Sequence, residues 1–163
     1  MSRRSESNPA ALLPALRTHL WFGGCPEPLQ VALVERSRLI HLSAGEGLRE
    51  DAQDGLCCVI AGALRMGSAH PEHGTQRLTL YVEPYHWFGE VSLIDRIPRA
   101  MTAVADTDST VLVVPKSAIE PWLDANPVHW RDLARLACGK LRLMTAALED
   151  SASLTLQQDR KST

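Results

Sequence analysis

The sequence shows almost no excess of either charge and contains no long apolar run. Its 163 residues carry 17 Lys and Arg against 19 Asp and Glu, which gives a formal net charge of −2. This balance argues against a strongly basic nucleic-acid surface and against a polybasic membrane patch. No run reaches membrane-spanning length, and no signal-type hydrophobic core follows residues 1–6. We therefore expect a cytoplasmic protein that binds neither nucleic acid nor membrane directly.

Cysteine is scarce, and the four cysteines have no metal-ligand spacing. They are Cys25, Cys57, Cys58 and Cys138. Cys57 and Cys58 are neighbours in an apolar run typical of a buried strand, where adjacent side chains face opposite ways and do not share a metal. We interpret the cysteines as buried thiols and predict no metal site. The chain length and an apolar content of 45% fit one globular domain.

The sequence also lacks a recognisable catalytic set. Of its six histidines, His70 and His73 lie in an expected hairpin loop, and His86 precedes Glu90 by four residues. A metal-dependent cupin oxygenase needs His-x-His with a nearby Glu and a further His. No Ser-His-Asp or Cys-His set is visible in the local sequence. We predict that the chain is not an enzyme, with a cupin-like metal enzyme as a minor alternative.

From Arg38 to Pro115 the sequence consists of brief apolar stretches separated by Gly, Pro and Asp. Stretches of this kind predict short β-strands with turns between them. The predicted strands are at residues 39–42, 56–60, 63–66, 77–82 and 110–114. Regular short strands favour a sandwich or a jelly-roll barrel.

Apolar residues at helical spacing flank this central region on both sides. The predicted helices are at residues 8–22, 28–36, 116–125 and 127–149. The last of them starts at the pair Asn126 and Pro127, which suits an N-cap and a first helical turn. It carries an apolar stripe that can pack on the barrel or on a second copy. The polar residues 151–163 are expected to be a disordered tail.

The segment from Phe88 to Ala100 combines a phosphate cradle, a sugar acceptor and a cation. Gly89 allows a tight turn and a close approach of the backbone to a ligand, and the amides of the following turn can point at an anion. The ionised carboxylate of Glu90 only accepts hydrogen bonds, as the donating 2′-hydroxyl of a ribose requires. The planar guanidinium of Arg99 suits the two exocyclic oxygens of a cyclic phosphate. This chemistry predicts a cyclic-nucleotide pocket.

The order of residues here is Phe88-Gly89-Glu90-Val91-Ser92-Leu93-Ile94, followed by Pro98-Arg99-Ala100. It resembles the phosphate-binding cassette of the cyclic nucleotide-binding domain family, shared by bacterial Crp-Fnr-type regulators and the regulatory subunits of cAMP-dependent protein kinase. The resemblance extends from about Leu20 to Leu148. It implies a mainly β fold with flanking helices, in which residues 19–150 form a jelly-roll β-barrel (double-stranded β-helix) with its long C-terminal helix. Residues 1–18 would then be an N-terminal tail or helix.

The resemblance also implies a ligand, its contacts and an assembly. The cyclic nucleotide would be bound by Phe88, Gly89, Glu90, Val91, Ser92, Arg99 and Ala100. Ala100 favours cAMP over cGMP, because family members selective for cGMP often carry a threonine there. In Crp-type proteins the matching long helix is the dimer seam and caps the base. This implies a homodimer that signals through the long helix, and it places Thr145 beside the base.

Two features depart from a complete Crp-Fnr regulator. Such a regulator continues beyond the long helix into a winged helix-turn-helix, and no counterpart follows here, so we expect a sensor without a DNA reader. In addition, the turn at residues 48–52 is shorter than is usual in the family. The shortened turn favours an alternative, a ligand-free dimerisation or scaffold barrel, whereas the presence of both Glu90 and Arg99 argues against it.

Overall fold

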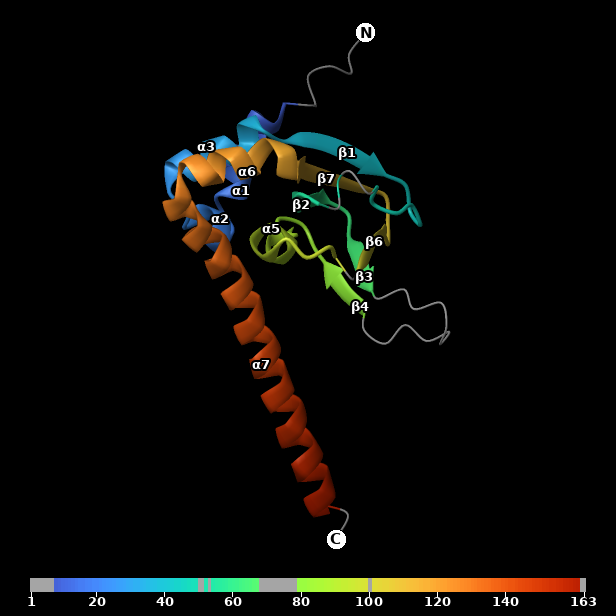
Figure 1. Ribbon diagram of the computed structural model, residues 1–163. Helices are drawn as coiled ribbons and strands as arrows, with labels where there is room; N and C mark the ends of the chain where they lie inside the picture. Colours follow the sequence, from blue (N-terminus) through green and yellow to red (C-terminus); the bar gives the residue numbers. More distant parts are fainter. Residues whose placement is uncertain (1–7, 50–51, 53, 68–78, 100, 162–163) are drawn as a thin grey trace.

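The computed structural model describes residues 8–49, 52, 54–67, 79–99 and 101–161 of the chain (Figure 1). Its strands are β1 (Arg38–Leu42), β2 (Leu56–Ala61), β3 (Leu64–Gly67), β4 (Thr79–Val82), β5 (Trp87–Phe88), β6 (Thr102–Ala105) and β7 (Ser109–Val114). Its helices are the 3-10 helix η1 (Pro9–Leu12), α1 (Leu13–Leu16), α2 (Leu20–Gly23), α3 (Glu27–Glu35), α5 (Glu90–Asp95), α6 (Lys116–Ala125), the 3-10 helix η2 (Pro127–His129) and α7 (Trp130–Lys161). Strands flanked by helices at both ends agree with the predicted order of elements.

The strands form two antiparallel sheets. One has four strands in the order β1-β7-β2-β5, and the other has three in the order β4-β3-β6. All five predicted strands are confirmed over their described residues except Ala63, which lies just before β3, whereas β5 and β6 were not predicted. Within the described part of the chain, no named strand of one sheet pairs with a named strand of the other. Closure into a jelly-roll barrel therefore stays a prediction.

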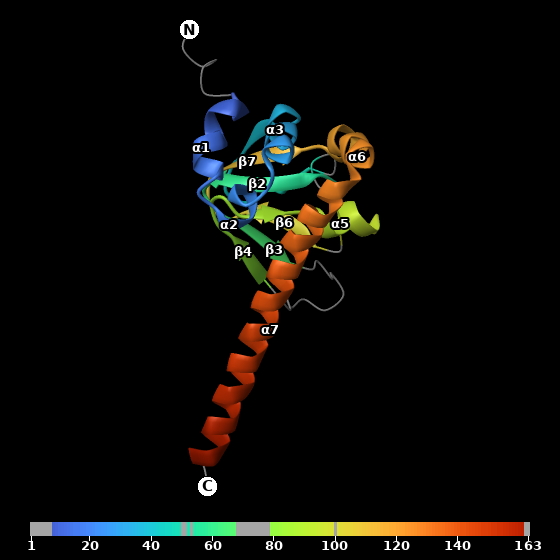
Figure 2. The same cartoon turned by 90° about the vertical axis from the view of Figure 1, so that its left-hand side faces the viewer.

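The central strands β2 and β7 are buried on both faces. On one face, Cys58 and Leu112 belong to an apolar core shared with the helices, and on the other, Cys57 and Val111 belong to a core between the sheets. The alternation follows from the period of two in a strand, since successive side chains point to opposite faces. Figure 2 shows the resulting layers, with α1, α3 and α6 on one side of β2 and β7, and with β3, β4 and β6 on the other.

The helix predicted at residues 8–22 is wrong as a single element. The chain forms η1, α1 and α2 instead, with a break at residues 17–19. In one continuous helix Leu16 and Phe22 would point about 120° apart. The break allows both side chains to reach the same core, where the Phe22 ring stacks on Trp87 with centroids 5.4 Å apart. The next predicted helix, at residues 28–36, is confirmed as α3.

The long C-terminal helix α7 leaves the body of the molecule as a rod (Figure 1). It begins at Trp130 and ends at Lys161, so the predicted end at residue 149 is wrong, as is the predicted disordered tail up to Lys161. No Gly or Pro follows Gly139 within this helix, and nothing in the sequence therefore interrupts the backbone hydrogen bonds. None of the described helices is long and apolar enough to cross a membrane. The predicted domain boundaries stay a prediction.

The start of the long helix also differs from the prediction. Residues 127–129 form the separate turn η2, and α6 ends at Ala125, as predicted. The Asn126 side chain makes no cap to the following turn and instead donates to the Trp122 carbonyl oxygen over 3.0 Å.

The cysteines agree in part with the prediction of buried thiols. Cys25, Cys57 and Cys58 are buried and Cys138 is exposed, which corrects the prediction for Cys138. Burial raises the pKa of Cys25 to about 12 and that of Cys57 to about 11. Both thiols therefore stay protonated near neutral pH, and they are poor nucleophiles because only the thiolate is reactive.

Gly139 offers a test of the geometry of α7. A Cβ atom placed at this glycine meets nothing within 4 Å. We expect Gly139→Ala to raise the free energy of unfolding by about 0.5–1 kcal/mol, because alanine costs less backbone entropy than glycine in a helix. Urea unfolding followed by circular dichroism measures this change. A loss of stability would show that another surface packs against this side of α7.

Candidate functional site

Gly89 forms the tight turn at the start of α5. Its φ is +101°, in the left-handed region, and it is the residue before the first helical position. A Cβ atom here would collide with the Arg99 guanidinium and with the Gly55 carbonyl oxygen. The absence of a side chain is therefore what allows the guanidinium to lie against the backbone at this turn.

Arg99 lies between the Gly89 turn and the first residues of β2. Its Nη2 donates to the Gly55 carbonyl oxygen over 2.6 Å, and its guanidinium carbon lies 5.2 Å from the centre of the Phe88 ring. The other two nitrogens, Nε and Nη1, are buried and find no hydrogen-bond partner among the described residues. Buried donors are nearly always paired in folded proteins, so these two nitrogens lack the acceptor that such groups usually have.

Glu90 is the most deeply buried charged residue of the site, with an exposed fraction of 1%. Both of its carboxylate oxygens lie 2.9 Å from the Nζ of Lys140, which comes from α7. A buried carboxylate is costly without a counter-charge, and Lys140 supplies one. The first residue of α5 is thus tied directly to the long helix.

Cys57 lies beneath the guanidinium of Arg99. Burial raises its pKa, and the nearby positive charge of Arg99 opposes this effect only in part. The thiol donates to the Ala52 carbonyl oxygen over 3.4 Å. It remains neutral and therefore supplies no counter-charge to Arg99.

The structure brings four of the predicted site residues together, namely Phe88, Gly89, Glu90 and Arg99. Val91 and Ser92 continue the same helix α5, where the Val91 side chain is 55% exposed and the Ser92 carbonyl accepts from the Arg96 amide.

Two of the predicted site residues do not join this group. Ala100 lies outside the described residues. Thr145 lies on α7, about 140° around the helix from Lys140, and its hydroxyl donates to the Leu141 carbonyl oxygen. The structure therefore does not bring Thr145 to the cassette of its own chain.

Lys140 and Gly55 were not predicted as parts of this site. A signal for Lys140 was present in the sequence, because it follows the buried Leu133 and Leu136 at helical spacing, where another apolar residue would be expected. A lysine at a position on the buried face of a helix indicates a buried acidic partner. Gly55 acts only through its backbone carbonyl, which no pattern of residue types reveals.

The histidines considered for a cupin-like metal site do not converge on Glu90. His86 is exposed and lies beside His19, with ring centroids 5.8 Å apart. His70 and His73 lie outside the described residues. Within the described ranges no three His, Cys, Asp or Glu side chains are grouped in a way that could hold a metal ion.

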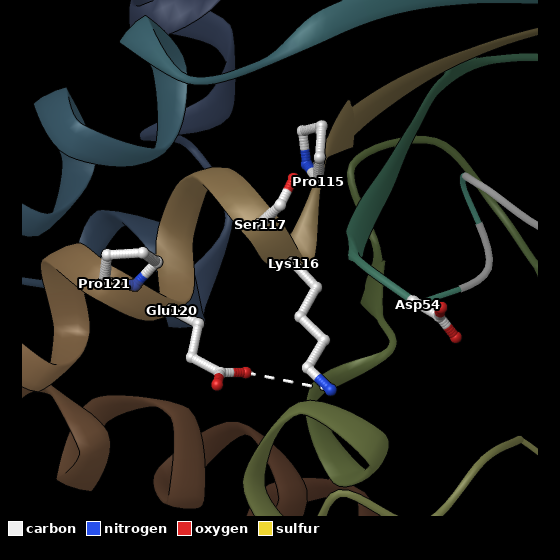
Figure 3. Close-up of a pocket in the computed structure, with 6 residues that line it drawn as sticks. All are labelled: Asp54, Pro115, Lys116, Ser117, Glu120 and Pro121. Carbon is white, nitrogen blue, oxygen red and sulfur yellow. Dashed lines mark ion pairs between the residues drawn. The ribbon is translucent and has the colours of Figure 1, made fainter.

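A separate cavity of about 360 Å³ lies between the start of β2 and α6 (Figure 3). It is lined by Asp54, Pro115, Lys116, Ser117, Glu120 and Pro121. Glu120 lies 3.8 Å from the Lys116 Nζ and 3.6 Å from the Arg96 Nη2. None of the predicted site residues lines this cavity, and its main charges pair with one another. The contact to Arg96 ties the end of α5 to α6.

Comparison with known proteins agrees with this geometry. A family model described as cyclic nucleotide-binding domain matches residues 40–126, which is more than half of the chain. The chain is also similar to a CRP-like cAMP-activated global transcriptional regulator of Mycobacterium tuberculosis, with 24% identity over 131 residues. That alignment covers 79% of this chain and 58% of the relative, so the chain spans well under two thirds of the relative's length.

Solved structures give the same result. The N-terminal domain of a transcriptional regulator from Streptomyces coelicolor is 26% identical with a TM-score of 0.61, over 81% of this chain and 95% of that one. The catabolite activator protein of Thermus thermophilus is 27% identical with a TM-score of 0.61, over 81% and 62%. The chain belongs to the cyclic nucleotide-binding domain family, as a domain of the kind found in CRP- and Fnr-like regulators.

Proposed function

We propose that the chain is a regulatory sensor that binds cAMP between Glu90 and Arg99. The observation that carries this proposal is the guanidinium of Arg99, two of whose buried nitrogens have no acceptor within the described residues. The two exocyclic oxygens of a cyclic phosphate can accept a pair of hydrogen bonds from the fork of an arginine guanidinium. The lack of a side chain at Gly89 is what lets this guanidinium lie against the backbone at the start of α5.

The charges of the site support a ligand with one negative charge. Among the described residues named here, Arg99 and Lys140 contribute two positive charges and Glu90 contributes one negative charge, so this group of three carries one positive charge. A cyclic phosphate diester carries a single negative charge, whereas a phosphate monoester carries between one and two near neutral pH. The match favours the cyclic form over an ordinary nucleoside monophosphate.

Glu90 is proposed to accept the hydrogen bond of the ribose 2′-hydroxyl. An ionised carboxylate has about four lone-pair positions, and Lys140 occupies two of them in this structure. The remaining positions can accept a hydrogen bond from a hydroxyl group while the ion pair is kept.

The preference for cAMP over cGMP rests on Ala100, which lies outside the described residues. Calorimetric titration with both nucleotides tests it. We expect saturable binding with one site per chain and a higher affinity for cAMP. If neither nucleotide binds in the millimolar range, the proposal is wrong and the ligand-free scaffold barrel becomes the better hypothesis.

Changing Glu90 to Gln is expected to weaken cAMP binding by about 1–2 kcal/mol, because an uncharged acceptor remains in place of the carboxylate. The affinity for 2′-deoxy-cAMP should change much less, since that analogue makes no contact through the missing hydroxyl. Titration of both ligands measures the difference. An equal loss for the two analogues would show that Glu90 does not contact the ribose.

Signalling through the long helix and homodimer formation are also parts of the proposal. Beyond Lys140, α7 exposes large apolar side chains, including Leu141 at 64%, Met144 at 49% and Leu148 at 70%. These three lie on one side of the helix, within about 60° of each other. An exposed stripe of this kind favours pairing with a second copy along α7. The predicted cytoplasmic location stays a prediction.

A further inference from the structure

Two histidines from distant parts of the sequence lie beside each other in the folded chain. His19 precedes α2 and His86 precedes β5, and their ring centroids are 5.8 Å apart with 62° between the ring planes. His86 is exposed and His19 is half-buried, so both rings can be reached from solvent. Within the described ranges neither ring forms an ion pair with a carboxylate.

The turn at residues 83–86 holds the backbone of His86 in place. The His86 amide closes the turn over 3.2 Å, and Tyr85 has a φ of +66°, which is the pattern of a type II turn with Pro84 at its second position. The Tyr85 amide donates to the Val59 carbonyl oxygen, and the Val59 amide donates to the His86 carbonyl oxygen. The turn is therefore fixed to β2, and movement at His86 is left to its side chain.

Tyr85 also positions the second histidine. Its ring stacks on the His19 ring with centroids 5.0 Å apart, and it packs against the core shared with the helices. His19 lies at the break between α1 and α2, where its carbonyl oxygen accepts from the Gly23 amide. The break that allows Leu16 and Phe22 to reach one core thus also brings His19 to the turn.

The ring nitrogens of the two histidines are suited to a metal ion. His86 Nδ1 lies 3.3 Å from the Pro84 carbonyl oxygen, which can only accept, so in the neutral ring Nδ1 carries the proton and Nε2 keeps its lone pair. A histidine that binds a metal through one nitrogen commonly donates from the other to a carbonyl oxygen. The His19 ring nitrogens make no hydrogen bond within the described part of the chain. Each neutral ring therefore has a lone pair that no described group uses.

We propose that His19 and His86 together bind one divalent transition-metal ion of the Cu²⁺, Ni²⁺ or Zn²⁺ class. Imidazole nitrogen is a preferred ligand of these ions. With nitrogen–metal distances of about 2.0–2.1 Å, two imidazole centroids around a tetrahedral ion lie roughly 5 Å apart, so the observed 5.8 Å must shorten by less than about 1 Å. Rotation of the exposed His86 side chain supplies this approach.

Water completes the coordination of such an ion. Among the residues that the structure describes, no three His, Cys, Asp or Glu side chains are grouped to hold a metal, so this pair supplies two ligands only. The site is thus open to solvent, unlike a structural zinc site with four protein ligands. A bound ion joins the N-terminal helices to the turn at residues 83–86, and nothing in this site depends on cyclic-nucleotide binding.

Calorimetric titration of the full chain with NiCl₂ and with ZnCl₂ tests the site. The titrations use a C138S background, because the exposed Cys138 thiol is also a ligand for these ions. We expect saturable binding of one ion per chain. H19Q and H86Q should each weaken it at least about tenfold, since each removes one of the two protein ligands. The matched control is H41Q, which removes an exposed histidine hydrogen-bonded to Thr110 and should leave the affinity unchanged.

Two further controls cover His70 and His73, which lie outside the described residues. H70Q and H73Q should bind Ni²⁺ and Zn²⁺ as the C138S parent does. A loss of affinity in any control equal to the loss in H86Q would overturn the proposal. Absence of binding of both ions in the millimolar range would overturn it as well.

Thermal unfolding gives an independent readout. ZnCl₂ should raise the Tm of the C138S protein, because an ion that binds only the folded chain stabilises it, whereas MgCl₂ should not, because Mg²⁺ prefers oxygen ligands. H86Q leaves the stacking of Tyr85 on His19 in place. It should therefore keep the metal-free Tm of the parent and lose the increase with ZnCl₂. An increase of the same size in H86Q would refute the site.

Discussion

Arg99→Ala is expected to weaken cAMP binding by about 2–4 kcal/mol, which corresponds to a loss of affinity of roughly 30- to 700-fold. The Arg99 side chain offers two buried nitrogens that lack an acceptor within the described residues. Its removal would leave the phosphate without its charged partner. Calorimetric titration of the variant measures the loss.

Arg96→Ala is the matched control for this prediction. Arg96 lies three residues earlier in the same segment, is largely exposed, and pairs with Glu120 at 3.6 Å. Like R99A, R96A removes one positive charge from this segment, but it leaves the Arg99 guanidinium at the Gly89 turn in place. We expect its cAMP affinity to stay within about threefold of that of the unchanged protein, since exposed ion pairs contribute little. Equal losses in R96A and R99A would mean that only the general charge matters.

Gly89→Ala is expected to abolish detectable cAMP binding and to lower the free energy of unfolding by at least about 1–3 kcal/mol. The positive φ of +101° is unfavourable for alanine, and the new Cβ would collide with the Arg99 guanidinium and the Gly55 carbonyl oxygen. Relief of the collision must move Arg99 away from the turn. Titration and urea unfolding report the two effects separately.

Gly45→Ala separates the cost of the backbone from the cost of the collision. Gly45 also has a positive φ, of +86°, but a Cβ atom there meets nothing within 4 Å. This variant should lose about 1 kcal/mol of stability and keep its affinity for cAMP. If Gly89→Ala behaved in the same way as Gly45→Ala, the close packing of Arg99 against the turn would not be required for binding.

The sequence predicted the parts of the fold that depend on local patterns. Helix α6 was predicted with its observed bounds, since Pro115 precedes it and helical spacing continues to Ala125. Strands β2 and β7 were predicted from their apolar runs, because central strands buried on both faces need apolar residues at every position.

The elements that were missed depend on tertiary contacts. Strand β5 contains only Trp87 and Phe88, and its identity as a strand comes from pairing with Cys57 and Cys58. The break between α1 and α2 follows from the need to bury Leu16 and Phe22 in the same core. Neither fact has a local signature in the sequence.

The candidate site was predicted to a similar degree. The motif identified Glu90 and Arg99 because their chemistry suits a ribose and a phosphate. It did not identify Lys140, which lies 50 residues from Glu90 along the chain and meets it only through the packing of α7 on α5. For the same reason, the sequence did not reveal that α7 packs on α5 through its Lys140 side, from which Thr145 faces away.

The most direct measurement is the NMR signal of the Arg99 Nε–H group, assigned by comparison with R99K, during titration with cAMP and with adenosine. The account predicts a saturable shift with cAMP, because the buried Nε gains a charged acceptor, and no such shift with adenosine, which lacks the phosphate. A signal that stays unchanged while cAMP saturates the protein would contradict the assignment of Arg99 as the phosphate-binding residue.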